Sequence, residues 1–128
     1  MEVVIDTNII ISALLSPDHA AFTFLSDVLD GKYVVYISEG IFREYDEVLH
    51  RKKFGFDEDI IQFLLSWFRH NAIWIEPKPT INKILDEKDR IFYDTARCSG
   101  SKLVTGNFRH YPVEENITAL WEIETSKF

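Results

Sequence analysis

The 128-residue chain lacks several features that would each indicate a particular class of protein. It has one cysteine, Cys98, so it cannot form an internal disulfide, and this cysteine usage suits a reducing compartment. Its longest apolar runs, such as Val3–Ile5 and Ile9–Ile11, are far too short to cross a bilayer. Met1 leads directly into the first of these runs, without the basic and long apolar segments of a secretory leader. We therefore expect a cytoplasmic protein without a membrane partner.

The chain also lacks an excess of basic residues. It has 14 Lys and Arg against 21 Asp and Glu, which gives a formal net charge of −7. Phosphate binding usually goes with a basic balance, so the composition alone argues against a nucleic-acid partner. Net charge is a poor guide, however, when several acids gather at one site and divalent cations neutralise them. The positions of the acids therefore decide the question.

Apolar residues are plentiful, at 46% hydrophobic and 14% aromatic, which is enough for one packed core. Segments with strand character alternate with segments of helical periodicity, as is typical of an α/β domain with a parallel sheet. No repeat or low-complexity linker divides them, so we expect a single domain over residues 1–128. The expected strands cover residues 3–5, 33–37, 72–75, 102–105 and 118–123. The expected helices cover residues 9–15, 16–30, 38–51 and 89–99, and a further helix opens at Asp57. The helix over residues 16–30 starts at Ser16-Pro17. The apolar stripe of the helix that opens at Asp57 consists of Ile60, Ile61, Leu64, Leu65 and Phe68.

Polar residues follow two of the expected strands. Asp6 ends the first strand and precedes a helix, and ligands of open parallel sheets bind beyond the carboxyl ends of the strands. Asp6 could equally be only the N-cap of that helix. Thr105-Gly106-Asn107 follows a later strand, where a glycine turn is the simplest interpretation. If the two strands are neighbours, Thr105 and Asn107 would line one pocket with Asp6.

Glu44 belongs to the apolar face of the third expected helix. It lies three residues after Ile41 and four before Val48, within the stripe that also holds Tyr45 and Leu49. An acid in such a position is costly unless it is paired or coordinated to a cation. A buried salt bridge, or a flanking position that reaches solvent, remains the alternative.

Three acids lie at or near the start of the fifth expected helix. Asp86 and Asp89 bracket its first turn, where the helix dipole favours acids and one of them could serve simply as a cap. Asp89 shares its helix face with Phe92 and Ala96, so we expect it to point inward. Asp94 could be an ordinary helix acid.

In combination these segments resemble the motifs of PIN domains, many of which are toxins of toxin–antitoxin systems. Val4-Ile5-Asp6-Thr7-Asn8 resembles the opening motif of the family, and Glu44–Arg51 resembles its second acidic motif. Asp89, with Asp94-Thr95-Ala96 after it, resembles the third motif, and Leu103–Asn107 the fourth. The likeness spans nearly the whole chain. The run from Thr105 to Pro112 resembles a branch that carries asparagine where many members have aspartate.

The resemblance implies a Rossmann-like parallel sheet of about five strands, with helices on both faces, and an endoribonuclease that uses Mg²⁺ or Mn²⁺ to hydrolyse RNA phosphodiester bonds. A cation of this kind lowers the pKa of a bound water and stabilises charge on the phosphate. The residues expected to hold the metal are Asp6, Glu44 and Asp89, with Asp94 assisting catalysis. The residues expected to orient the carboxylates are Asn8, Thr105 and Asn107. Because Asn107 removes one negative charge, the number of metal ions stays open.

The substrate contacts are less well defined. Basic residues that could contact RNA phosphates lie in the run His50–Lys53 and after the last motif, and those we select are Arg51, Lys52, Arg109 and His110. Solvated surface bases remain the simpler interpretation of all four. The sequence leaves open whether the partners include an antitoxin protein or a second copy of the chain.

Two other hypotheses compete with the nuclease. A receiver-like phosphoacceptor domain also gathers acids at strand ends. The first strand here lacks a doubled acid, however, and Ile37-Ser38 offers no aspartate after the second. A catalytically weak PIN-type module that mainly binds partners is the other alternative, with Asn107 as the mark of lost activity.

Overall fold

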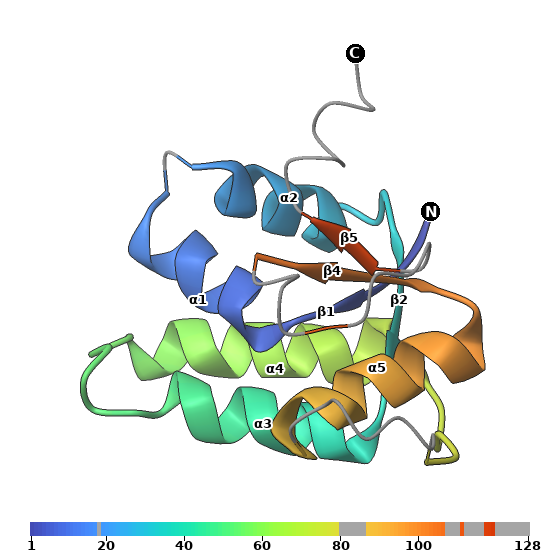
Figure 1. The fold of residues 1–128 in the computed structure, drawn as a ribbon. Helices are drawn as coiled ribbons and strands as arrows, with labels where there is room; N and C mark the ends of the chain where they lie inside the picture. The colour runs from blue at the N-terminus through green and yellow to red at the C-terminus, as the bar shows by residue number, and fades with distance from the viewer. Residues whose placement is uncertain (18, 80–86, 107–110, 112–116, 120–128) are drawn as a thin grey trace.

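The structure is a computed structural model that describes residues 1–17, 19–79, 87–106, 111 and 117–119 (Figure 1). Five strands in this part of the chain form one sheet in the order β3-β2-β1-β4-β5, and every neighbouring pair is parallel. The strands are β1 (Glu2–Ile5), β2 (Val34–Ile37), β3 (Ile73–Trp74), β4 (Lys102–Thr105) and β5 (Ile117–Ala119). The helices are α1 (Thr7–Leu15), α2 (Ala20–Leu29), α3 (Glu39–Leu49), α4 (Glu58–Asn71) and α5 (Glu87–Ser99).

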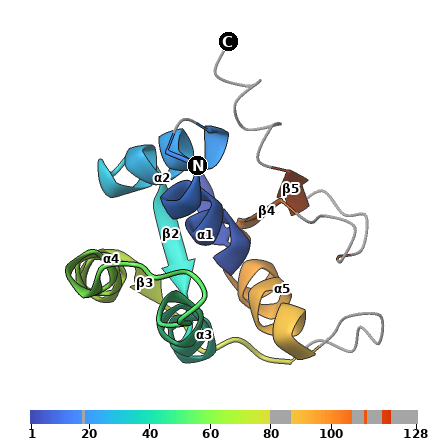
Figure 2. The same cartoon turned by 90° about the vertical axis from the view of Figure 1, so that its left-hand side faces the viewer.

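Successive strands are added first on one side of β1 and then on the other, so the strand order reverses at the middle of the sheet. The chain passes from β1 outward to β2 and β3, and α5 then returns it to β4 on the other side of β1. Because crossovers between parallel strands are right-handed, α5 covers the opposite face from the helices of the outward path. Figure 2 shows α4 and α5 on opposite sides of β2. The predicted Rossmann-like sheet of about five strands, with helices on both faces, is confirmed.

The centre of the core is the pair β1 and β4, whose apolar side chains are buried because helices cover both faces. Helix α3 is fixed to β1 by Tyr45, whose hydroxyl donates a hydrogen bond to the carbonyl of Ile5. The Tyr45 ring packs against Phe68 of α4 and Phe92 of α5, with ring centroids 5.0 and 6.3 Å away. One buried side chain therefore ties three helices to the central strand.

Several helix ends agree with the sequence. Ser38 caps α3 by accepting a hydrogen bond from the N–H of Ile41 at 3.3 Å, and Asp57 caps α4 by accepting one from Asp59 at 2.8 Å. Gly100 follows α5 with a φ of 69°, a conformation that glycine adopts without strain.

Some expected boundaries are wrong. Helix α2 begins at Ala20 rather than at Ser16-Pro17, because the N–H of Ser16 is used to end α1 by bonding to Ser12. Ile60, expected in the inward stripe of α4, is 47% exposed, whereas the other four members of that stripe are buried. The last strand is described over Ile117–Ala119, and residues 120–123 of the expected strand lie outside the described residues.

Among the described helices, none alone is long and apolar enough to span a membrane; α1 and α2 reach that criterion only as a pair, with a sharp bend between them.

Candidate active site

Asp6 lies at the carboxyl end of β1, where the strand order reverses and ligands of open α/β sheets bind. Its N–H donates to the carbonyl of Val104 at 3.0 Å, which fixes it against β4. Its side chain is 6% exposed: Oδ1 accepts the N–H of Asn8 at 3.2 Å, and Oδ2 accepts the Thr105 hydroxyl at 2.9 Å. Asp6 is therefore the N-cap of α1, and its second oxygen still faces the neighbouring strand.

Glu44 reaches the same region from α3. The Tyr45 hydroxyl is bonded to the carbonyl of Ile5, so the residue before Tyr45 is brought close to the residue after Ile5, which is Asp6. Glu44 is half-buried, and burial raises the pKa of its carboxyl. The negative charges of Glu47 and Asp6 raise this pKa further, and the positive charges of Lys88 and Arg51 oppose them. Glu44 is thus neither sealed in the core nor free in bulk water.

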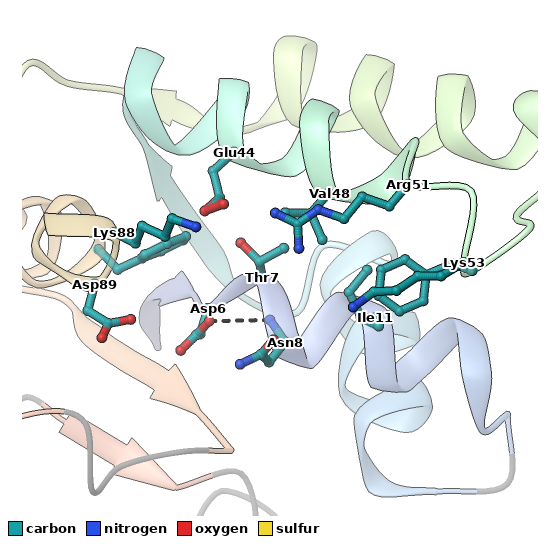
Figure 3. A pocket seen from close by; sticks show the side chains of 12 residues that line it. Asp6, Thr7, Asn8, Ile11, Glu44, Val48, Arg51, Lys53, Lys88 and Asp89 are labelled. Carbon is teal, nitrogen blue, oxygen red and sulfur yellow. Dashed lines mark hydrogen bonds between the residues drawn. The ribbon is translucent and has the colours of Figure 1, made fainter. Parts of the chain in front are cut away.

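Asp89 comes from the first turn of α5. As expected, Phe92 and Ala96 on its helix face are buried, and Phe92 packs against Tyr45 of α3. Asp89 itself is half-buried. Figure 3 shows its carboxylate beside that of Asp6, with Glu44 facing both from α3.

These three acids line one cavity of about 230 Å³ (Figure 3). Three basic residues, Arg51, Lys53 and Lys88, line it as well. The close-up places the amino end of Lys88 next to Glu44, in agreement with its effect on the Glu44 pKa. The protein therefore offsets part of the negative charge of this cavity with its own cations, of which the sequence analysis had selected only Arg51. The lining is completed by Thr7, Asn8, Ile11, Val48, Phe54 and Phe92.

Tyr111 belongs to the same cluster although sequence reasoning missed it. Its hydroxyl donates a hydrogen bond to Asp6 Oδ2 at 3.2 Å. Burial raises the pKa of Tyr111 far above its ordinary value, and the charges of Asp6 and Asp89 raise it further. Tyr111 is therefore a neutral hydrogen-bond donor. Its place after the last motif carries no periodicity from which this contact could be derived.

The residues predicted to orient the carboxylates differ in whether and how they contact Asp6. Thr105 makes the contact with Asp6 that an orienting role requires. Asn8 reaches Asp6 through its backbone N–H, and its exposed side chain lines the cavity. Asp94 is buried, at 6% exposed, but is not among the described residues that line the cavity. Asn107 lies outside the described residues.

The basic residues expected to contact RNA phosphates also differ in whether they line the cavity. Arg51 lines the cavity, where its guanidinium is held by Glu47 at 3.0 Å. Lys52 is exposed and does not line it; the neighbouring Lys53 does, with its amino group 5.1 Å from the centre of the Phe54 ring. Arg109 and His110 lie outside the described residues. A signal for Lys88 did exist: a cation in the first turn of a helix opposes the helix dipole, so its position needs a reason.

The donor atoms around the cavity suit a hard divalent cation, because carboxylate, amide and hydroxyl oxygens are the ligands that Mg²⁺ and Mn²⁺ prefer. The Thr7 hydroxyl adds a second observation, since it is buried without a hydrogen-bond partner in the part of the chain that is described. The acids are not yet in ligating positions: within the described residues, no three Asp, Glu, His or Cys side chains are close enough together to hold an ion. A cation held directly by all three acids would therefore need Glu44 and Asp89 to lie closer to Asp6.

Comparisons with known proteins identify the fold and the family. A family model described as PIN domain matches residues 2–109. An uncharacterised protein of Methanocaldococcus jannaschii is 33% identical over 110 residues, which are 84% of this chain and 71% of that protein. Among solved structures, that of VapBC2 from Rickettsia felis, bound to a DNA fragment from its promoter, has a similar fold. It has a TM-score of 0.60 and 18% identity, and the match covers 93% of this chain and 97% of the other. Whether the chain belongs to the branch with Thr105-Gly106-Asn107 stays a prediction. The model match alone covers most of the sequence, and the chain therefore belongs to the PIN domain family.

Proposed function

We propose that this protein is a metal-dependent endoribonuclease that uses Mg²⁺ or Mn²⁺ and acts in the cytoplasm. PIN domains are generally nucleases that use a divalent metal. The observation that carries the proposal is the gathering of Asp6, Glu44 and Asp89 around one cavity at the reversal point of the sheet. With family membership established, the receiver-like alternative loses its support.

Each side chain has a role that follows from its position. Asp6, Glu44 and Asp89 would hold the cation, which when bound activates water and stabilises charge on the scissile phosphate. Thr105 keeps Asp6 in one rotamer through its hydrogen bond. Lys53 attracts the RNA backbone into a cavity that would otherwise repel it. Asp94 is not among the described residues that line this cavity, so its assistance in catalysis stays a prediction.

The decisive experiment compares Asp6→Asn with the wild-type protein on single-stranded RNA in Mg²⁺ or Mn²⁺. We expect cleavage by the wild type and a loss of at least about 100-fold in the variant, as for removal of a central catalytic group. Asp30→Asn is the matched control, because Asp30 is an exposed acid just before β2, at the other end of the strands. Glu44→Gln provides a second test should Asp6→Asn fail to fold. Inactivity of the folded wild type across RNAs and metals would instead favour the weak PIN-type binding module.

An exposed apolar groove favours an additional role as the toxin of a toxin–antitoxin pair. The groove has a volume of about 400 Å³ and lies between α1, α2 and α4. Phe22, Ile60 and Phe63 line it while remaining 43%, 47% and 59% exposed. The exposure of Ile60, unexpected from its helix face, is thereby explained. Asp59 also lines the groove, and the chain carries a net charge of −7, so we propose as occupant an antitoxin segment with an apolar face and basic flanks.

A growth experiment tests the toxin role. Expression of the wild type should arrest bacterial growth, and co-expression of a protein that carries the proposed antitoxin segment should relieve the arrest. Phe63→Glu should keep the toxicity and lose the relief, because a charge then enters the apolar groove. If Phe63→Glu instead dissociates a homodimer of the purified protein and leaves the relief intact, the groove is a contact between copies of the chain.

A further inference from the structure

Thr7 carries a buried hydroxyl group that has no hydrogen-bond partner among the described residues. The residue is 5% exposed, and its Oγ1 is closed off from solvent. Burying a hydroxyl without a partner costs free energy, and native proteins rarely leave such a group unsatisfied without a reason. Thr7 also lines the cavity that the three acids line. Its position therefore calls for a partner that comes to it within this cavity.

The geometry around Thr7 indicates which acid this partner is. Asp6 precedes Thr7 in the chain, but both of its carboxylate oxygens already accept hydrogen bonds, at 3.2 and 2.9 Å. Figure 3 shows the Thr7 oxygen pointing toward the side of the cavity on which Glu44 lies. Glu44 is thus the acid that this hydroxyl faces.

Any approach of Glu44 to Asp6 also brings it toward Thr7, because Asp6 caps α1 and Thr7 is the first residue of that helix. A cation held directly by both acids would need their carboxylates to lie closer together. Tyr45, next to Glu44 on α3, is bonded to the carbonyl of Ile5, so the helix is anchored to β1. The movement therefore falls to the Glu44 side chain.

We propose that Thr7 is a positioning residue whose hydroxyl donates a hydrogen bond to the Glu44 carboxylate when Glu44 and Asp6 together hold the divalent cation. This inference rests on the proposed function, because it concerns the same site. Groups that hydrogen-bond a metal ligand fix its orientation, and the Thr105 hydroxyl is placed to do so for Asp6. The Thr7 hydroxyl gains its partner only with the cation, so the cost of its burial is relieved on binding.

Thr7→Val tests the inference because it removes the hydroxyl and keeps the branched shape of the side chain. We expect the Kd for Mn²⁺, titrated against the folded protein by electron paramagnetic resonance, to rise about 10-fold, as for other groups that orient metal ligands. The Tm of the metal-free variant should equal or exceed that of the wild type, because valine removes a buried group that has no partner. A residue that only supported the fold would show the opposite pattern, with a lower Tm and an unchanged Kd.

Two further variants serve as controls. Thr7→Ser keeps the hydroxyl and should bind Mn²⁺ within about twofold of the wild type, the scatter expected for independent sites. Thr23→Val makes the same substitution at an exposed position of α2, which is not among the described residues that line the cavity. It should leave both the Kd and the Tm unchanged. Thr7→Ala repeats the measurement of the Kd should Thr7→Val fail to fold.

A double-mutant cycle tests the pairing with Glu44. In a Glu44→Ala background the Thr7 hydroxyl has lost its proposed partner, so adding Thr7→Val should change the Kd for Mn²⁺ by less than about twofold. A loss of affinity as large as that in the wild-type background would overturn the inference, because the hydroxyl would then act on another group.

The outcomes separate this inference from the proposed function. If the wild type binds no Mn²⁺ and cleaves no RNA, the proposed function fails and the inference fails with it. If the wild type binds Mn²⁺ and Thr7→Val binds it equally well or more tightly, the inference alone is overturned. A Tm of metal-free Thr7→Val well below that of Thr23→Val would also overturn it, because the hydroxyl would then have a partner before the metal binds. Weaker binding of RNA with an unchanged Kd for Mn²⁺ would assign the hydroxyl to the substrate and contradict the inference as well.

Discussion

Individual side chains make the cavity almost balanced in charge. Asp6, Glu44 and Asp89 face Arg51, Lys53 and Lys88 across the same space. Clustered carboxylates alone would repel one another and the phosphates of RNA. The three bases reduce that repulsion before any cation arrives, which would allow a chain of net charge −7 to accept the proposed RNA substrate at this cavity.

Lys53 and its neighbour Lys52 offer a direct test of which basic residue meets RNA. Lys53 lines the cavity and Lys52 points elsewhere on the surface. Each phosphate contact on a single strand contributes roughly 0.7 to the slope of log K against log salt concentration. We expect Lys53→Gln to reduce this slope by about that amount in an inactive Asp6→Asn background, and Lys52→Gln to leave it unchanged. Equal effects of the two substitutions would show that surface charge in general attracts the RNA.

We expect Lys88 to weaken the affinity for the proposed cation. Its ammonium lies beside Glu44 and repels any second positive charge in the cavity. At about 4 Å two unit charges interact by about 1 kcal/mol even in water, and a unit charge and a divalent ion by about twice that, so Lys88→Met should tighten Mn²⁺ binding roughly 30-fold. Isothermal titration of the two proteins measures the difference. Weaker binding by Lys88→Met would mean that Lys88 supports the metal site and does not compete with the metal.

Part of the site could be predicted because its residues carry local signals. Asp6 ends an apolar strand, Glu44 interrupts an apolar helix face, and Asp89 shares a face with Phe92. The position of Thr105 next to Asp6 could be predicted once β4 was assumed to lie beside β1, as it does in the sheet. Tyr111 could not be found in this way, because it lies in neither a helix nor a strand and no repeat fixes the direction of its side chain.

At the scale of elements, the junction between α3 and α4 is held by a pair of exposed groups. His50 follows α3, and its Nε2 lies 2.8 Å from the carboxylate of Glu58, the first residue of α4. This hydrogen bond, with a second to the carbonyl of Asp46, raises the pKa of His50. The hydrogen bonds from His50 and Gln62 lower the pKa of Glu58.

The stability that this junction contributes depends on pH. The raised pKa of His50 means that its contribution is complete below the ordinary value of 6.5 and is lost as pH rises through the folded-state value. The contribution of Glu58 is present above 4.5 and is lost as pH falls through its lowered value. We expect His50→Gln to lower the Tm more at about pH 5.5 than at about pH 8.5, on either side of the ordinary histidine pKa. His70→Gln, whose ring bonds to Ser66, should show no such difference.

The sheet was more predictable than the helix starts. Five apolar segments separated by helical periodicity allow few arrangements other than a parallel sheet with crossovers. The start of α2 was placed wrongly because Ser16-Pro17 has the composition of an N-terminus, whereas the backbone of Ser16 already completes α1. Composition indicates which residues could cap a helix, and tertiary packing decides which of them does.

For the whole molecule, a bound cation should act as a stabilising ligand. A ligand that binds only the folded state adds about 2.7 kcal/mol at 100 times its Kd. We therefore expect Mn²⁺ to raise the Tm of the wild type by several degrees in differential scanning calorimetry, and to raise that of Asp6→Asn far less. An equal rise in both proteins would place the ion away from the cavity.

The hydrogen bonds of Asp6 connect residues that are distant in sequence. The Thr105 and Tyr111 hydroxyls that reach its carboxylate lie 99 and 105 residues further along the chain. During translation the first strand leaves the ribosome long before either partner has been synthesised. The proposed ribonuclease thus stays unassembled beside the RNA that encodes it, and a prematurely terminated fragment lacking β4 would lack both the strand next to β1 and the hydroxyl groups that position Asp6.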